Sequence, residues 1–589
     1  IEANLPEDPV AREKVLKRIE RKKRRRKRTK RFLCILLVIA IVAGFYGYFN
    51  RDKLVTKISG KLVGGLELVQ YCIRVISVPM IAEDVDLVSI MAKTMEDKEF
   101  NALEGSTFPE KYDLRDVDGK NYVTSVKSQG YFGTCWTFGT IAAAETTLMT
   151  QLDMPVVDGV DPIDLSERHL GWFTYMPFIG GNQDGEGLLV ANDDFSGYST
   201  DPITVLNHGG KSYFAASIFK TGVGVAPEMI APYRPEEMKD LDIEYLIDLC
   251  KGKDLNDENV IEELRQDPVF AQAEPYLMFS TEGKLANWST EGDGGLDDSL
   301  HFYQVVPLKE TKTLPVPQFG DPKGVNALKQ ELSEGRAIVI SYFADDSTPS
   351  QLSEDNEGKR YMNWNDDGTW AQYTYDFQMI NHEVCIVGWD DTYPASNFNE
   401  NPDLCPPGDG AWIVKNSWGS VNNEFPNNSR RGSWGTDGTG YFYLSYYDRS
   451  IGSAECMSFA VEDLQKNIES TVIEEYDFMT GASAVPLSLP KIMNASSANV
   501  FVAEFDENMH SVGVDVGSAA DIDVYVYRLN EGYKSPIDGE LVDTISFHID
   551  YPGFHRVALN NPQEIHTGDA FSVVLEEHTE KGDVVTLHI

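Results

Sequence analysis

The sequence predicts an α+β domain followed by an all-β sandwich, with one membrane-crossing helix near the N-terminus. A helix-favouring stretch at residues 135–150 is followed, far along the chain, by β-branched apolar runs at 382–391 and 411–419. From about residue 459, short alternating strands are separated by turn residues. The chain of 589 residues exceeds what one hydrophobic core usually organises, which favours several domains.

The first 49 residues combine a basic head with an uncharged apolar run. Residues 1–31 carry a formal charge of +9, whereas the whole chain carries −42. Residues 32–49, FLCILLVIAIVAGFYGYF, would span about 27 Å as a helix, enough for a short membrane helix. Positive charge on the N-terminal side predicts a single-pass signal anchor, with the head in the cytoplasm and the rest outside the cell membrane. The alternative is a cleaved signal peptide and a secreted protein.

The charge of the remaining chain disfavours polyanionic partners. Beyond residue 31 the chain carries −51, which opposes binding to nucleic acid and to anionic lipid surfaces. We therefore expect no nucleic acid partner, and contact with the membrane only through the N-terminal helix.

The seven cysteines are scattered singly and lack the even pattern of a small disulfide-stapled domain. We expect Cys250, Cys385 and Cys456 to be small apolar core residues.

Three motifs carry residues with catalytic chemistry. QGYFGTCW leads into CWTFGTIAAAETTLMT, so Cys135 should stand in the first turn of a helix, where partial positive charge stabilises a thiolate. NHEVCIVGWDD places His382 at the start of an apolar strand, and WIVKNSWGS places Asn416 in the turn after another. A thiol, an imidazole that carries a proton and an amide that orients the ring are the parts of a nucleophilic site.

In this order, these motifs and the closing GSWGTDGTGYFYLSYYD of residues 432–448 resemble the papain-like cysteine peptidases. The resemblance implies a two-lobed fold, with a helical lobe and an antiparallel β-barrel-like lobe. It implies that Cys135 attacks a peptide carbonyl, that His382 carries the proton and that Asn416 orients the imidazole ring. It also implies that the Gln129 side chain and the Cys135 backbone N–H stabilise the oxyanion.

The resemblance further implies where a substrate would lie. Residues 207–234 resemble the family's cleft wall, with Gly209 and Gly210 offering backbone to an extended peptide. Trp136 and Trp418 are assigned to the same substrate site, and Trp418 would also shield the catalytic hydrogen bond from solvent. No metal or cofactor is expected.

The spacing of the motifs predicts an insertion. His382 lies 247 residues beyond Cys135, where about 130 to 150 are expected for papain-like enzymes. The likeliest place for the extra residues is near 235–320. The Asp-Gly cluster at 291–298 lacks the ligand spacing of an EF-hand, so we interpret it as a solvated loop and not as a Ca²⁺ site.

Two further resemblances divide the chain into domains. FPEKYDLRD at 108–116 resembles the start of mature papain-like domains, and the final strands, with YPGFHRVAL and GDAFSVVLEE, resemble a lectin-like domain of some bacterial papain-like peptidases. The expected order is a basic head, a membrane anchor, a stalk or short propeptide, a peptidase domain and a truncated lectin-like sandwich, over residues 1–31, 32–49, 50–107, 108–457 and 458–589.

These features predict a bacterial cysteine peptidase, displayed outside the cell membrane, that hydrolyses peptide bonds through a thioester. Endopeptidase action is favoured because no motif blocks either end of the cleft; an exopeptidase capped by the insertion is the alternative. The expected partners are a peptide or protein substrate and, through the sandwich, a cell-surface glycan, with a domain that only packs or spaces as an equal alternative. Two other functions stay open: a surface adhesin or scaffold whose cleft binds without cleaving, and a thiol acyltransferase.

Overall fold

The chain divides into two compact units, residues 1–101 and 102–589, and the computed structural model describes parts of the second. The described residues are 108–129, 132–176, 202–220, 224–233, 258–273, 306–317, 320–345, 361–420, 434–461 and 494–579, with a few single residues between them. The predicted head, anchor and stalk lie outside these residues, and so does most of the predicted insertion. Within the described ranges, no helix is both long and apolar enough to cross a membrane.

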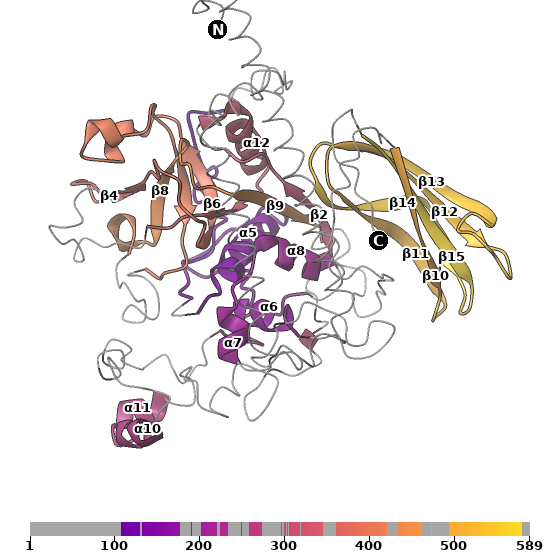
Figure 1. The fold of residues 1–589 in the computed structure, drawn as a ribbon, viewed down its shortest axis with the longest axis horizontal. Coiled ribbons are helices and arrows are strands. Elements are labelled where there is room, and N and C mark those ends of the chain that lie inside the picture. The colour runs from indigo at the N-terminus through magenta and orange to yellow at the C-terminus, as the bar shows by residue number, and fades with distance from the viewer. Residues whose placement is uncertain are drawn as a thin grey trace, which may run out of the picture. The chain divides into compact units, whose positions relative to one another are not determined.

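The central helix is α5, Cys135–Gln151, which packs against strands on one side and against shorter helices on the other. Its residues 136–149 are all buried, most of them apolar or small, and the charged one among them is Glu145. Figure 1 shows the neighbouring helices in purple and magenta near α5. The other helices are α6, α7, α8, α10, α11 and α12, over Glu167–Phe173, Pro202–Asn207, Ser212–Lys220, Glu258–Leu264, Pro268–Ala273 and Pro322–Ser333.

A mixed but mainly antiparallel sheet carries the other half of the catalytic motifs. Its strands follow the order β11-β14-β2-β9-β3-β6-β7-β8-β5-β4, with β1 beside β6, and β5 and β8 are parallel. Strands β6 and β7 are buried along their whole length, which explains why the middle of each sequence is apolar. The bounds of β1 to β9 are Lys111–Asp113, Leu308–Thr313, Ile338–Tyr342, Met362–Trp364, Trp370–Gln372, His382–Asp390, Ala411–Lys415, Tyr441–Ser445 and Ser453–Phe459.

Two hydrophobic cores lie on the two sides of α5. One gathers residues of β3, β6, β7 and β8 with α12, and includes Trp389 and Trp412. The other gathers residues of α5, α6 and α8, and includes Trp136 and Trp172. This division agrees with the predicted pair of a helical lobe and a strand-rich lobe, with α5 packed between them.

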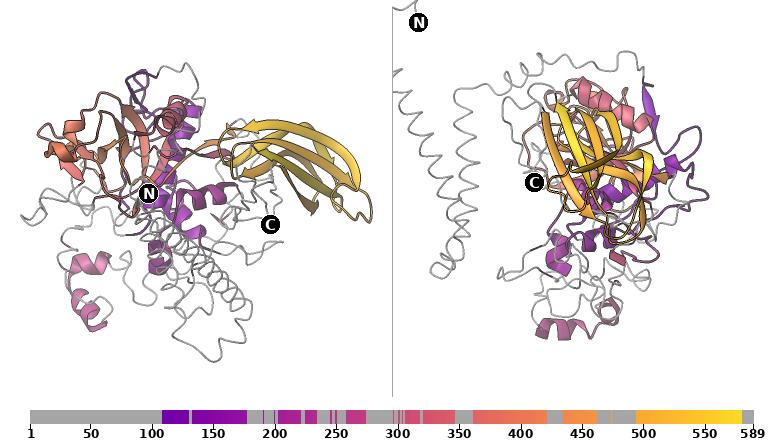
Figure 2. Two further views of the ribbon diagram at one scale, coloured as in Figure 1. Left: turned by 45° about the horizontal axis from the view of Figure 1, so that its top comes forward. Right: turned by 90° about the vertical axis from the view of Figure 1, so that its right-hand side faces the viewer.

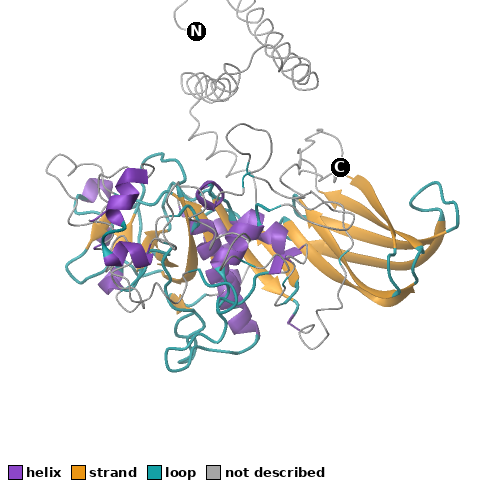
Figure 3. Cartoon of the chain, turned by 90° about the horizontal axis from the view of Figure 1, so that it is seen from below, coloured by secondary structure: helices purple, strands orange, loops and turns teal. Residues whose placement is uncertain are grey.

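The C-terminal strands form two layers, as the alternating sequence predicts (Figure 2). One layer is a four-stranded sheet in the order β10-β15-β12-β13, and the other contains β11 and β14. Apolar side chains of both layers meet in one core that includes Val514 and Val524. Strands joined by turns and loops make up the described part of this region (Figure 3). The bounds of β10 to β15 are Asn494–Val502, Glu507–Val516, Ala520–Leu529, Gly539–Ile549, Gly553–Ile565 and Ala570–Thr579.

One feature of the sheet was not predicted. Strand β14 pairs with β2 at His555 and Glu310, so one layer of the sandwich continues the sheet of the preceding domain. Strand β9 ends at Phe459 and therefore crosses the expected boundary at residue 457.

The described cysteines behave largely as expected. Cys385 and Cys456 are free thiols in the core, with exposures of 0% and 1%. Cys250 lies outside the described residues.

Candidate active site

Cys135 is the first residue of α5, where the sequence predicted it. Cys135 is partly exposed as a residue, and the backbone N–H groups of Glu383 and Trp136 donate to its sulfur, which favours the thiolate. Burial has the larger effect, and with the nearby Glu383 carboxyl it raises the pKa of the thiol to about 12. The predicted stabilisation by the helix N-terminus is therefore present but outweighed, so the thiolate needs a further positive partner.

His382 begins β6 and is held from two directions. Its Nε2 lies 2.7 Å from Oδ1 of Asn416, the residue that follows β7. The same oxygen accepts the Ser417 backbone N–H at 2.8 Å, and two donors on one atom fix the orientation of the amide. The Trp418 ring stacks on the imidazole, with centroids 4.7 Å apart and planes inclined by 27°. The ring therefore covers one face of the imidazole.

Gln129 lies beside Ser417, the residue that follows Asn416. Its backbone N–H donates to the Ser417 carbonyl at 2.9 Å, and its Oε1 accepts the Ser417 hydroxyl at 2.7 Å. Its Nε2 donates one proton to the carbonyl of Phe132 at 2.8 Å, which leaves the second proton of the amide for another acceptor. Ser417 was not predicted, and its position directly after Asn416 is the only sequence signal for it.

Helix α5 lies close enough to β6 to bring Cys135 beside the strand that His382 begins. At Gly139, an added Cβ would lie 3.3 Å from the backbone nitrogen of Val384. A larger residue at this position would push the helix away from the strand, which explains the glycine in an otherwise helix-favouring run.

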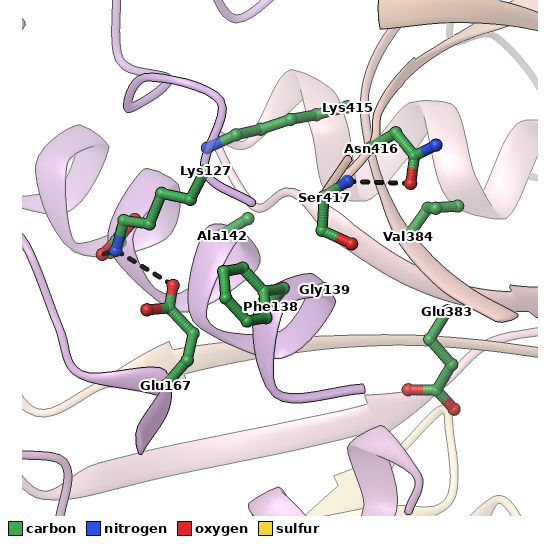
Figure 4. A pocket seen from close by; sticks show the side chains of 11 residues that line it. Lys127, Phe138, Gly139, Ala142, Glu167, Glu383, Val384, Lys415, Asn416 and Ser417 are labelled. Carbon is green, nitrogen blue, oxygen red and sulfur yellow. Dashed lines mark hydrogen bonds and ion pairs between the residues drawn. The ribbon is translucent and has the colours of Figure 1, made fainter. Parts of the chain in front are cut away.

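A partly buried ionic network joins the segments of the site, and Figure 4 shows Lys127, Glu167 and Lys415 around one pocket. Lys127, two residues before Gln129, pairs with Glu145 of α5 at 3.0 Å and with Glu167 of α6 at 2.9 Å. The carboxylates raise the pKa of Lys127 well above its ordinary value despite burial, whereas burial raises the pKa of Glu167 to about 7. Asp164 adds a third ion pair to Lys127 at 2.7 Å.

The network reaches the Asn416 segment through a short chain of hydrogen bonds. Lys415 donates to the Thr124 hydroxyl at 2.9 Å, and that hydroxyl donates to Glu145 at 2.6 Å. Burial lowers the pKa of Lys415. Paired charges at this depth fix the relative positions of the segments that carry Gln129, Cys135 and Asn416.

The predicted cleft wall has the expected glycines. Gly209 has φ +81°, a backbone conformation that favours glycine, and its carbonyl accepts the Tyr175 hydroxyl. At Gly210, an added Cβ would come within 2.3 Å of the Trp136 ring. Trp136 itself is 1% exposed, so the assignment of its side chain to the substrate site is corrected: the ring supports Gly210 from behind.

In the described part of the chain, no group of metal-ligand atoms gathers at this site. Among the described residues, three potential metal-ligand atoms lie within 4.8 Å of one another at Asp523, Glu576 and His578 of the sandwich. There His578 is paired with Asp523 at 3.3 Å.

Comparisons with known proteins agree with two parts of the chain. Residues 108–170 match the family model of papain family cysteine proteases, and residues 482–589 match that of a lectin-like domain. No curated protein matches the chain. These family matches confirm the predicted resemblance to papain-like peptidases with a lectin-like domain.

Two similar solved structures come from the cysteine protease Cwp84. The clostridial enzyme after propeptide cleavage is 19% identical, over 81% of this chain and 86% of that chain, with a TM-score of 0.47. The cysteine protease and lectin-like domains of Cwp84, a surface layer associated protein of Clostridium difficile, are 19% identical over 82% of this chain and 78% of that one, with a TM-score of 0.46.

Proposed function

We propose that this chain, with its papain-family segment at residues 108–170 and lectin-like domain at 482–589, is a cysteine peptidase that cleaves internal peptide bonds. The observation that carries the proposal is the 2.7 Å contact between His382 Nε2 and Asn416 Oδ1, on a strand whose next residue, Glu383, bonds the sulfur of Cys135. A thiol, an oriented imidazole and an amide donor are together what acyl transfer requires.

The first half of the reaction forms a thioester. With Nε2 donating to Asn416, Nδ1 is the nitrogen of His382 that exchanges protons with the Cys135 thiol. The imidazolium formed in this exchange supplies the positive partner that the buried thiolate needs. The thiolate attacks the peptide carbonyl carbon, the oxygen becomes an oxyanion, and the C–N bond breaks as His382 returns the proton to the leaving amine.

The second half of the reaction hydrolyses the thioester. Water gives a proton to His382 and adds to the thioester carbonyl, after which the C–S bond breaks and the carboxylic acid leaves. In both halves, the free amide proton of Gln129 and the Cys135 backbone N–H would donate to the oxyanion. Removing one such donor costs on the order of 3 kcal/mol of transition-state stabilisation.

Display outside the cell and glycan binding complete the proposal. The basic residues 1–31 and the apolar run 32–49 support a membrane anchor with the catalytic part outside. The match of residues 482–589 to a lectin-like domain supports a surface glycan as a second ligand. A glycan array probed with the whole chain tests this second part, and an array without signal would leave the sandwich as a structural domain.

The peptidase proposal is tested by incubating the whole chain with a fluorogenic peptide library under reducing conditions, beside Cys135→Ala. Turnover that the substitution abolishes is the expected result. Adding an amine acceptor and analysing the products separates hydrolysis from acyl transfer, since a transferase would yield the new amide in place of the free acid. Tight peptide binding with no turnover would favour a scaffold.

A further inference from the structure

Glu383, the residue directly after His382, has a buried carboxyl group with one defined partner. The residue is 4% exposed, and its Oε2 accepts the backbone N–H of Ser212 at 2.9 Å. Ser212 is the first residue of α8 and is 1% exposed. A carboxyl group buried in this way is costly unless it is hydrogen-bonded, so the contact with Ser212 stabilises both ends.

The Ser212 contact joins the glycine wall of the cleft to the catalytic strand. The wall, defined here as residues 209–212, is held at Gly209 by the Tyr175 hydroxyl and at Gly210 by the Trp136 ring. Both of these contacts reach the helical side of the domain. The Ser212 N–H reaches β6, the strand that carries His382.

We propose that Glu383 is a positioning residue that holds the glycine wall in register with His382 and Cys135. An extended substrate would lie along the backbone of the wall while its scissile carbonyl faces the thiol. A shift of the wall therefore moves the carbonyl relative to the nucleophile, and a displacement of about 1 Å is enough to slow such reactions strongly. The inference rests on the peptidase function proposed above.

The charges around Glu383 give this role a pH dependence. The carboxyl group faces Glu455 of β9, Lys211 before α8, Cys135 of α5 and Tyr175 after α6. Burial, followed by the repulsion of Glu455, raises the pKa of Glu383 to about 8. The group is therefore mainly neutral at pH 7, and above pH 8 its negative charge opposes formation of the Cys135 thiolate.

The first test is amide hydrogen exchange of the whole chain, which needs no enzymatic activity. Glu383→Ala removes the acceptor for the Ser212 N–H, whereas Glu383→Gln retains a carbonyl oxygen of the same reach. We expect exchange in peptides covering the wall to rise about tenfold or more in Glu383→Ala and to stay near wild type in Glu383→Gln. Unchanged exchange in the alanine variant would overturn the inference.

The second test is steady-state kinetics with an extended peptide and a short ester. We expect Glu383→Ala to lower kcat/KM for the extended peptide about tenfold, mainly through kcat, and to leave the short ester within about threefold, because only the extended peptide uses the wall. Glu383→Gln should restore kcat and carry the alkaline limb of kcat/KM to higher pH. Equal losses for both substrates, or a limb that does not move, would contradict the positioning role.

A control and a comparison separate the possible failures. Glu310→Ala removes a carboxyl group on β2 that accepts the Ser458 hydroxyl, so it should lower stability without changing kcat/KM. A wild-type chain without turnover, but with the expected exchange pattern in the Glu383 variants, would refute the peptidase function and leave the link between wall and strand intact.

Discussion

His382 and Asn416, 34 residues apart in the sequence, meet at 2.7 Å between Nε2 and Oδ1. The contact joins the first residue of β6 to the residue after β7, two antiparallel strands that are paired from Cys385↔Lys415 to Asp390↔Ala411. The pairing brings the imidazole and the amide together, and Trp418 stacks on the ring that they hold. The orientation of the imidazole is thus set by the sheet.

Asn416→Ala should reduce kcat on the order of 10- to 100-fold with little change in KM, because the imidazole loses the partner that fixes its orientation. The matched control is Asn363→Ala, which removes another buried amide, one that donates to Asn365 and Asn397 away from the site. Steady-state kinetics and thermal unfolding, measured on both variants, separate a loss of catalysis from a loss of stability. Equal kcat values for both variants would show that the contact with His382 has no catalytic role.

Gln129→Ala should lower kcat by about 10² to 10³, and Ser417→Ala by about tenfold, because the Ser417 hydroxyl only orients the Gln129 amide. Since one residue acts through the other, the double variant should be no slower than Gln129→Ala alone. A double-mutant cycle in kcat/KM measures this coupling. Fully additive losses would mean that Ser417 acts independently of Gln129.

His382→Ala should slow alkylation of Cys135 by iodoacetamide at pH 7 at least about a hundredfold. Burial raises the pKa of this thiol to about 12, so without the imidazolium the reactive thiolate is scarce. Peptide mass spectrometry over time gives the rate at Cys135 specifically. The control is His548→Ala on the exposed face of the sandwich, which should leave the rate unchanged. An unchanged rate in His382→Ala would rule out the ion pair.

His169 should make the fold sensitive to acid. It is 0% exposed, its Nε2 lies 2.6 Å from the Leu300 carbonyl, and burial lowers its pKa to about 4. The unfolded chain binds the proton more readily, so the stabilisation is complete above about pH 6.5 and is lost as the pH falls towards 4. The loss amounts to about 3 kcal/mol.

His169→Gln should flatten this part of the pH profile, since glutamine does not titrate. Chemical denaturation between pH 4 and pH 7.5 gives the free energy of unfolding for both chains. If both lose the same free energy between these limits, another group is responsible for the acid sensitivity.

The sequence predicted the motif elements well, because each depends on local signals. The alanine-rich run after Cys135 forms α5. The apolar run that follows His382 and the one that precedes Asn416 both form buried strands. The alternating segments near the C-terminus likewise form strands. Their sheet partners were not predictable: β14 joins β2 through His555, a pairing that no local pattern encodes.

The parts of the site that the sequence did not predict depend on contacts between distant segments. The Ser417 hydroxyl meets Gln129 across 288 residues, and a serine in a turn gives no sign of that partner. Glu383 is an acidic residue in a mainly apolar strand, and its buried contact with Ser212 of α8, 171 residues away, leaves no local signal in the sequence. The pKa of Cys135 was misjudged for the same reason, since the helix N-terminus is visible in the sequence and the burial of the sulfur is not.

The most direct test of the central claim is the mass of the chain during turnover. The whole chain is mixed with an activated peptide ester, quenched in acid within milliseconds to seconds, and digested for mass spectrometry. We expect an acyl group on the peptide that contains Cys135, transient in the wild type and absent in Cys135→Ala. Ester or peptide turnover that persists in Cys135→Ala, with no acyl group on this cysteine in the wild type, would contradict that claim.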